Sequence, residues 1–320
     1  MPTFETLLIF TAAALGLSVV FRYFPAAYGV VKLIGAVLCM AFVPVLHAGP
    51  NVTLVGDDYR GVVMREVAAD ERSEIRRGGD VYELAVKSAG VTMRSLVPGG
   101  SSIAMADLLH VTDIALIVID STRGATPVIR EHILIARQAR VPMLAMLMTN
   151  VERLHAGAPD EAAELLVVEV QEIRELLSSY DLNGGSVDVY YDARMPEGMV
   201  TAAGFGIRET LRVLSRAVSR RVRPEELPSV SELWGAVYLL TDLEADGNAV
   251  TLSPQDKITV WSEGTRSRAT LNSISQYHPG DFREMSLSLE EPLSGMEGSR
   301  ILLLSGERVV GLGAITQIGH

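Results

Sequence analysis

The chain has 320 residues and a formal net charge of −11 at pH 7, so its surface as a whole does not favour DNA or other free nucleic acid. One cysteine, Cys39, excludes an internal disulfide and a cysteine-rich metal site. The six histidines show no metal-ligand spacing, and no bound metal is expected.

Two uncharged apolar segments stand at the N-terminus, Leu7–Phe21 and Leu33–Leu46, separated by an aromatic turn with Arg22 near one end and Lys32 near the other. Extended by their neighbours, both segments reach the ~20 residues that cross a bilayer. The two cations suit an interface, because long charged side chains reach the headgroups. We predict that residues 1–50 form a helical, transmembrane hairpin that anchors the protein. A buried helical pair in a water-soluble protein is the alternative.

A short apolar strand is predicted at Val52–Val55, followed by a helix that begins near Gly61. Gly56 and Gly61 keep the glycine spacing of the phosphate loop G-x-x-x-x-G-K-[ST]. Val62 and Val63 stand where that loop places its phosphate-binding Lys and its Mg²⁺-binding hydroxyl. Taken alone, two glycines are better explained by an ordinary strand-to-helix turn, and the match to a phosphate loop becomes informative only together with the segments that follow it.

The next predicted strands are Val81–Lys87 and a segment that ends in the turn Pro98-Gly99, and Glu71–Gly79 before them is expected to be charged loop or helix end. The stretch Val111–Glu152 then has the pattern strand, turn, helix, strand. The sequence REHILIARQARVP, which begins at Arg130, covers the predicted helix and its end.

This central segment, together with SRILLLSGERVVGLGAI at Ser299–Ile315, resembles the translation elongation factor Tu family of GTPases. The resemblance implies an α/β, P-loop GTPase-like domain with a mostly parallel sheet at residues 51–223. It further implies a linker at residues 224–228 and a small antiparallel β-barrel at residues 229–320, like the third domain of the family. The second domain of the family has no counterpart here.

The residues that carry nucleotide chemistry in this family are altered. In the segment that corresponds to D-x-P-G-H, Pro98 and Gly99 remain, whereas Leu96 replaces the Mg²⁺-binding Asp and Gly100 replaces the His. The guanine-reading Asn-Lys-x-Asp corresponds to the letters TNVE, and Asn150 fits it only after a shift of one residue.

The relic positions of a nucleotide site are therefore Gly56, Gly61, Pro98, Gly99 and Asn150. We predict a pseudo-GTPase without catalytic residues and without a cofactor. The alternative is an active GTPase that binds GTP or GDP with Mg²⁺ through non-standard motifs.

In the family, the helix that carries REH faces the third domain and contributes to binding of the exchange factor. The matching residues here are Arg130, Glu131, His132 and Gln138, which predict a protein-interaction surface at this helix, at the barrel, or at both. A helix that only holds the two domains together is the equal alternative.

A basic helix is predicted at Gly206–Val222, where a stripe recurs every four residues on one face: Arg208, Arg212, Arg216 and Arg220. A solvated helix face is the simpler interpretation of this stripe. Contact with anionic lipid headgroups is the sharper one, because the predicted hairpin would bring the stripe to a membrane.

The sequence therefore predicts a membrane-associated binding or regulatory protein in translation, with its folded domains in the cytoplasm. The Arg22–Lys32 turn by itself favours the opposite orientation. Delivery of tRNA is not expected, because the second domain that helps to hold the aminoacyl end is missing. A structural membrane anchor for another complex is a third possibility.

Overall fold

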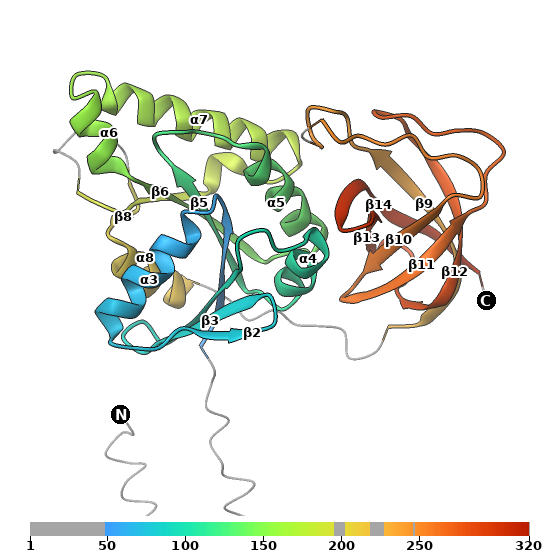
Figure 1. Ribbon diagram of the computed structural model, residues 1–320, viewed down its shortest axis with the longest axis horizontal. Coiled ribbons are helices and arrows are strands. Elements are labelled where there is room, and N and C mark those ends of the chain that lie inside the picture. The colour runs from blue at the N-terminus through green and yellow to red at the C-terminus, as the bar shows by residue number, and fades with distance from the viewer. Residues whose placement is uncertain (1–48, 195–201, 218–226, 246, 320) are drawn as a thin grey trace, which may run out of the picture. The chain divides into compact units, whose positions relative to one another are not determined.

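The computed structural model describes residues 49–194, 202–217, 227–245 and 247–319 (Figure 1). The described residues belong to one compact unit, Gly49–His320. The predicted membrane hairpin lies outside the described residues. Within those ranges, none of the helices combines the length and the apolar character needed to cross a bilayer.

The first part of the larger unit is built on an eight-stranded sheet with the order β2-β3-β4-β1-β5-β6-β7-β8. Its strands are β1 (Asn51–Gly56), β2 (Arg76–Gly78), β3 (Val81–Val86), β4 (Val91–Leu96), β5 (Ile114–Asp120), β6 (Met143–Thr149), β7 (Asp188–Tyr191) and β8 (Gly204–Phe205). From β4 to β8 all neighbours are parallel, and only the pairs β2–β3 and β3–β4 are antiparallel. The predicted α/β class with a mostly parallel sheet is confirmed.

The apolar runs of the central strands follow from their burial on both faces. All seven residues of β5, IALIVID, are buried, as expected for a parallel strand covered by helices on each side. One face packs against α4 (Ser102–His110), α5 (Pro127–Gln138) and α7 (Ala162–Ser179). The other packs against α3 (Arg60–Glu71) and α8 (Ile207–Ala217) (Figure 1). The short helices α6 (Val151–Gly157) and η2 (Gly184–Ser186) lie in the connections.

Local signals explain where the helices begin. Pro127 is the first residue of α5, a position at which its fixed φ suits the helix and its missing N–H costs nothing. Ser101 precedes α4, and its side chain accepts a hydrogen bond from the Ala104 amide at 3.3 Å. The helix α4 and the strand β2 were not predicted. The three residues of β2 are exposed and charged or glycine, so they carry no alternation of apolar and polar residues.

The second part is a closed barrel with the strand order β10-β11-β12-β9-β14-β13. Its strands are β9 (Ser229–Leu239), β10 (Lys257–Ser262), β11 (Thr265–Leu271), β12 (Phe282–Ser294), β13 (Arg300–Ser305) and β14 (Arg308–Gly319). All neighbours are antiparallel, and closure removes the free edges of the sheet. The predicted antiparallel barrel is confirmed.

A continuous hydrophobic core joins the two parts. Trp261, Leu302 and Leu312 of the barrel pack in the same buried cluster as α4 and α5. The indole Nε1 of Trp261 donates to Oδ1 of Asp107 at 2.8 Å, and its ring meets that of His110 edge-on at 5.9 Å. An apolar contact of this kind holds neighbouring domains in one arrangement.

Candidate functional site

The order of the sheet reverses at β1. The chain leaves β1 to build β2, β3 and β4 on one side and then crosses to β5, β6 and β7 on the other. In open α/β sheets, ligands bind outside the carboxyl ends of the strands at such a switch point. The residues that follow β1, β5, β6 and β7 therefore form the candidate site (Figure 1).

The connection from β1 to α3 begins at Gly56, which has a φ of +96°. A Cβ at this position would lie 2.4 Å from the carbonyl oxygen of Val118, so only glycine fits. The connection is short, and α3 begins at Arg60, one residue before Gly61. The two glycines of the predicted phosphate loop therefore frame a tight turn.

Four amides of this turn are bonded within the protein. The Gly56 N–H donates to Nδ1 of His132 at 2.9 Å, and the Asp57 N–H donates to the Val118 carbonyl at 3.2 Å. The amides of Arg60 and Gly61 donate to carbonyls of the turn itself at 3.0 and 3.1 Å. A phosphate loop instead leaves such amides open to the ligand.

Carboxylates occupy the positions beside these amides. Asp57 is buried, and its Oδ1 accepts from Oγ1 of Thr126 at 2.7 Å while its Oδ2 accepts from the Asp120 amide at 3.4 Å. Asp192, after β7, accepts from the amides of Asn150 and Val151 at 2.7 and 3.4 Å. The protein thus places its own carboxylates at the end of β5, through Asp57, and at the start of α6, through Asp192.

The electrostatics of the switch point disfavour a polyanion. Burial raises the pKa of Asp192 to about 6, although the hydrogen bonds from the Asn150 and Val151 amides lower it. The nearby charges of Glu66 and Glu152 act in the same direction as burial. Burial and then the charge of Asp120 raise the pKa of Glu169 to about 7. Both shifts are the response expected where carboxylates are crowded and partly desolvated.

The other relic positions lie around this turn. Gly99, in the turn after β4, has a φ of +75°, and Pro98 lines the same cavity as Gly61. Asn150 begins α6 in the left-handed region with a φ of 58°, at the carboxyl end of β6. The structure therefore brings Gly61 and Pro98 together and places Asn150 at the end of another strand.

The predicted interaction residues on α5 all have partners inside the chain. His132 is only 7% exposed, and burial followed by the charge of Arg60 lowers its pKa to about 3. Arg130 lies 3.4 Å from Glu172, and Glu131 accepts a hydrogen bond from Oγ of Ser102. The His132 ring lies inside the α/β part and not on an outer surface.

Gln138 joins α5 to the barrel. It is 2% exposed, and its Nε2 donates to the carbonyl oxygens of Ile301 and Gly313 at 2.8 and 2.9 Å. This geometry is that of a residue that holds the two parts together. The sequence alone had predicted this role and a partner surface as equal alternatives.

The basic stripe on α8 is partly neutralised. Arg208 lies 2.9 Å from Asp70, and Arg212 lies 2.6 Å from Glu209. Arg216 stands in the last turn of the helix. Arg220 falls outside the described residues. In the described part of the stripe, two of the three cations thus have carboxylate partners.

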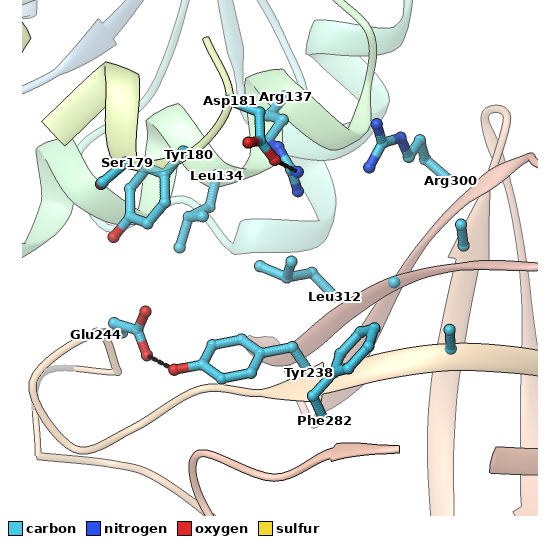
Figure 2. Close-up of a pocket in the computed structure, with 13 residues that line it drawn as sticks. Leu134, Arg137, Ser179, Tyr180, Asp181, Tyr238, Glu244, Phe282, Arg300 and Leu312 are labelled. Carbon is cyan, nitrogen blue, oxygen red and sulfur yellow. Dashed lines mark hydrogen bonds and ion pairs between the residues drawn. The ribbon is translucent and has the colours of Figure 1, made fainter. Parts of the chain in front are cut away.

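A cleft of about 510 Å³ lies where α5 and the end of α7 face the barrel (Figure 2). Nη2 of Arg137 lies 2.6 Å from Oδ2 of Asp181, and the hydroxyl of Tyr238 donates to Oε2 of Glu244 at 2.8 Å. Phe282 is 69% exposed at its lower edge. No local sequence pattern indicates this cleft, because its walls come from segments that are distant in the chain.

Positive charge gathers beside the cleft. Arg300 lines it, and burial together with the charges of Arg137 and Arg140 lowers the pKa of Arg300. The cleft therefore combines aromatic and apolar walls with a cationic end. Such a combination is common where proteins bind partners.

Among the residues that the structure describes, no group of three or more His, Cys, Asp or Glu side chains has the arrangement needed to hold a metal ion. Comparison of the chain with known protein families finds no matching family model.

Proposed function

We propose that this protein is an elongation factor Tu-like pseudo-GTPase that works in translation by binding a protein partner. In this proposal the nucleotide chemistry is lost, and residues 1–50 tether the protein to a membrane. One observation carries the loss of nucleotide binding. Four amides of the turn between β1 and α3, those of Gly56, Asp57, Arg60 and Gly61, are bonded to His132 and to carbonyls of the protein, whereas a phosphate loop would offer such amides to a ligand.

Two further features support the same conclusion. Asp57, Asp120 and Asp192 lie at the carboxyl ends of the strands, where the phosphates of a nucleotide would be repelled. Val62 and Val63 can supply neither a cation nor a metal ligand.

The partner surface that we propose is the cleft between α5, the end of α7 and the barrel. The exposed ring of Phe282 and the half-buried guanidinium of Arg300 are the two groups in it that suit a protein contact. Aromatic and arginine side chains are enriched among the residues that dominate such interfaces.

The test of nucleotide loss is calorimetry of GTP and GDP with Mg²⁺, using the full chain in a non-ionic detergent. No heat of binding is expected up to millimolar nucleotide. Micromolar affinity would sink the pseudo-GTPase proposal and favour the active GTPase.

A second variant tests whether the turn itself is the cause. The double substitution Val62→Lys and Val63→Thr restores the two missing side chains. We expect it to remain unable to bind GTP, because the loop amides and Asp57 are unchanged. Restored binding would show instead that only these two side chains were lacking.

The partner surface is tested by capture from membranes of the cells that make this protein. Arg300→Glu reverses the charge in the cleft, whereas Arg308→Glu makes the same change at an exposed position that does not line it. Loss of one translation component with Arg300→Glu alone is expected. Equal capture by both variants would place the partner elsewhere.

A further inference from the structure

Arg300, the first residue of β13, has a guanidinium without a partner among the described residues. It lines the cleft between α5, the end of α7 and the barrel, and its side chain is half-buried. It makes no hydrogen bond and no ion pair within the described part of the chain. None of its nitrogens is sealed from solvent, so an occupant of the cleft can reach them. Partial burial of charged donors without an acceptor has a cost that a bound anion would remove.

The charged groups around Arg300 do not supply this anion. Asp181, which acts on Arg300 from a distance, is paired with Arg137 at 2.6 Å. Arg140 donates to the carbonyl oxygen of Gly298. Burial, followed by the charges of Arg137 and Arg140, lowers the pKa of Arg300, as expected where cations crowd together. This end of the cleft therefore attracts a negative group.

The other carboxylate that lines the cleft, Glu244, is already satisfied by the barrel. Its Oε2 accepts from the hydroxyl of Tyr238 at 2.8 Å and from the amide and the hydroxyl of Thr241 at 2.9 and 2.7 Å. Hydrogen bonds to a carboxylate stabilise its charge where it stands. Among the described groups that line the cleft, the charge left without a partner is therefore the positive charge of Arg300.

Aromatic and apolar side chains line the rest of the cleft. Figure 2 shows Tyr180 and Leu134 on the helix wall, and Tyr238, Phe282 and Leu312 on the barrel wall. The Phe282 ring is 69% exposed, so most of its surface is open to an occupant. An anion alone would leave these groups in contact with water, so the occupant also needs an apolar part.

The lining of the cleft on β9 and β14 admits a main chain. Ala236, Gly313 and Ala314 contribute to it, and none of them has a side chain beyond Cβ. Small residues on strands are typical of places where another backbone approaches closely. The cleft volume of about 510 Å³ lies in the range of sites that hold a ligand. An extended segment of a protein can therefore lie there and contact both Arg300 and Phe282.

We propose that the cleft binds an extended acidic segment of the partner protein, in which a carboxylate pairs with Arg300 and an apolar side chain packs against Phe282. A guanidinium presents parallel N–H donors that match the two oxygens of a carboxylate. The inference rests on the proposed function, because it names the chemistry of the partner at the same surface. A nucleic acid fits less well, because Asp181 and Glu244 line the cleft and would repel its further phosphates.

The experiment selects binders from random peptides displayed on phage, with the full chain in a non-ionic detergent as the target. The wild type should enrich peptides that carry Asp or Glu close to an apolar residue. Arg300→Glu should lose this enrichment, whereas Arg308→Glu, the same change at an exposed position outside the cleft, should keep it. Failure to enrich any peptide, enrichment without acidic residues, or the same acidic peptides with Arg300→Glu overturns the proposal.

A selected peptide then measures the two contacts separately by fluorescence anisotropy. Exchange of its acidic residue for the corresponding amide should weaken binding at least about tenfold, the scale of a charge-assisted pair. Phe282→Ala should also weaken binding about tenfold, as for an aromatic anchor of an interface. Ile274→Ala removes another exposed apolar side chain outside the cleft and should leave binding unchanged. Both positions are exposed, so both variants should fold, as followed by circular dichroism. Equal affinity of the two peptides, or of the two variants, contradicts the assignment.

Two combined outcomes separate this inference from the proposed function. Capture of a translation component through Arg300, together with selected peptides that lack acidic residues, would keep the partner surface and refute the acidic segment. Acidic peptides that bind at Arg300, without capture of any translation component, would support the acidic segment and refute the role in translation. Displacement of the selected peptide by a short single-stranded RNA would assign the cleft to nucleic acid and overturn the inference.

Discussion

The backbone amide of Gly56 donates a hydrogen bond to Nδ1 of His132 at 2.9 Å, across 76 positions of the sequence. This bond ties the end of β1 to the middle of α5. It requires a ring nitrogen with a free lone pair, and therefore a neutral histidine. Burial and the neighbouring charge of Arg60 lower the pKa of His132 to about 3, which keeps the ring neutral at physiological pH.

His132 makes stability depend on pH. Its pKa in the folded protein, about 3, lies below the ordinary value of 6.5, so between these values the unfolded chain binds a proton that the folded chain does not. The His132 contribution is fully present above pH 6.5. As the pH falls below that value, the free energy of unfolding should decrease by at most about 1.4 kcal/mol per pH unit.

Urea denaturation of the wild type and of His132→Asn at pH 7.5, 6.5 and 5.5 measures this contribution. The variant should lose part of the stability at pH 7.5, about 1 kcal/mol for one hydrogen bond, and should show a shallower decrease at low pH. Asp192 and Glu169, whose pKa values are raised, contribute a slope of opposite sign but do so equally in both proteins. If the free energy of unfolding depended on pH in the same way in both proteins, a neutral His132 that accepts the Gly56 hydrogen bond would be contradicted.

Gln138→Leu should weaken the joint between the α/β part and the barrel. The substitution removes both hydrogen bonds to Ile301 and Gly313 inside a buried contact, at a cost of about 1–3 kcal/mol. Gln171 lies on the exposed side of α7, where its side-chain amide donates to Glu175, and Gln171→Leu should change stability by less than about 0.5 kcal/mol.

Fluorescence of Trp261 reports this joint directly, because its indole is buried between Asp107 and His110. In a Trp234→Phe background it is the only tryptophan in the chain. Denaturation curves followed by Trp261 should shift to lower urea with Gln138→Leu. Coincident curves for the Gln138 and Gln171 variants would show that the hydrogen bonds contribute nothing.

Gly264 sets how closely the barrel approaches α4. It has a φ of +80°, and a Cβ there would lie 2.6 Å from Cδ2 of His110. Gly264→Ala should therefore cost both backbone strain of about 1–2 kcal/mol and overpacking of about 1–3 kcal/mol. Gly298→Ala is the matched control, since Gly298 has a φ of +83° with nothing within 4 Å of its Cβ. The Tm of the Gly264 variant should be lower than that of the control. Equal Tm values would exclude a tight contact between Gly264 and His110.

The membrane tether is tested by removing residues 1–48. The full chain should remain in the membrane pellet after a carbonate wash, whereas the unit Gly49–His320, which has its own hydrophobic clusters, should be released. Two apolar segments of about 20 residues supply enough burial in lipid for this difference. Release of the full chain by carbonate would refute the anchor, and retention of the shorter chain would move it to another part of the protein.

The described architecture could be predicted from the sequence wherever burial leaves a local pattern. The apolar run of β5, the amphipathic α5 and the alternating strand β9 can each be recognised from a few residues, because a parallel strand, a helix face and a barrel strand have different apolar periods. The altered residues Val62, Val63, Leu96 and Gly100 equally indicated, without coordinates, that ordinary GTPase chemistry is not expected.

Only the tertiary structure decided what the remaining residues do. The neighbours of His132 and Gln138 in the helix do not reveal whether these side chains contact a partner, a loop amide or the barrel. Their contacts are made with Gly56, 76 positions from His132, and with Ile301, 163 positions from Gln138. The cleft that Arg300 and Phe282 line exists only once the barrel packs against α5 and the end of α7. Local patterns record which side of an element is buried, whereas hydrogen-bond partners and cavities are made by the packing of elements that are distant in sequence.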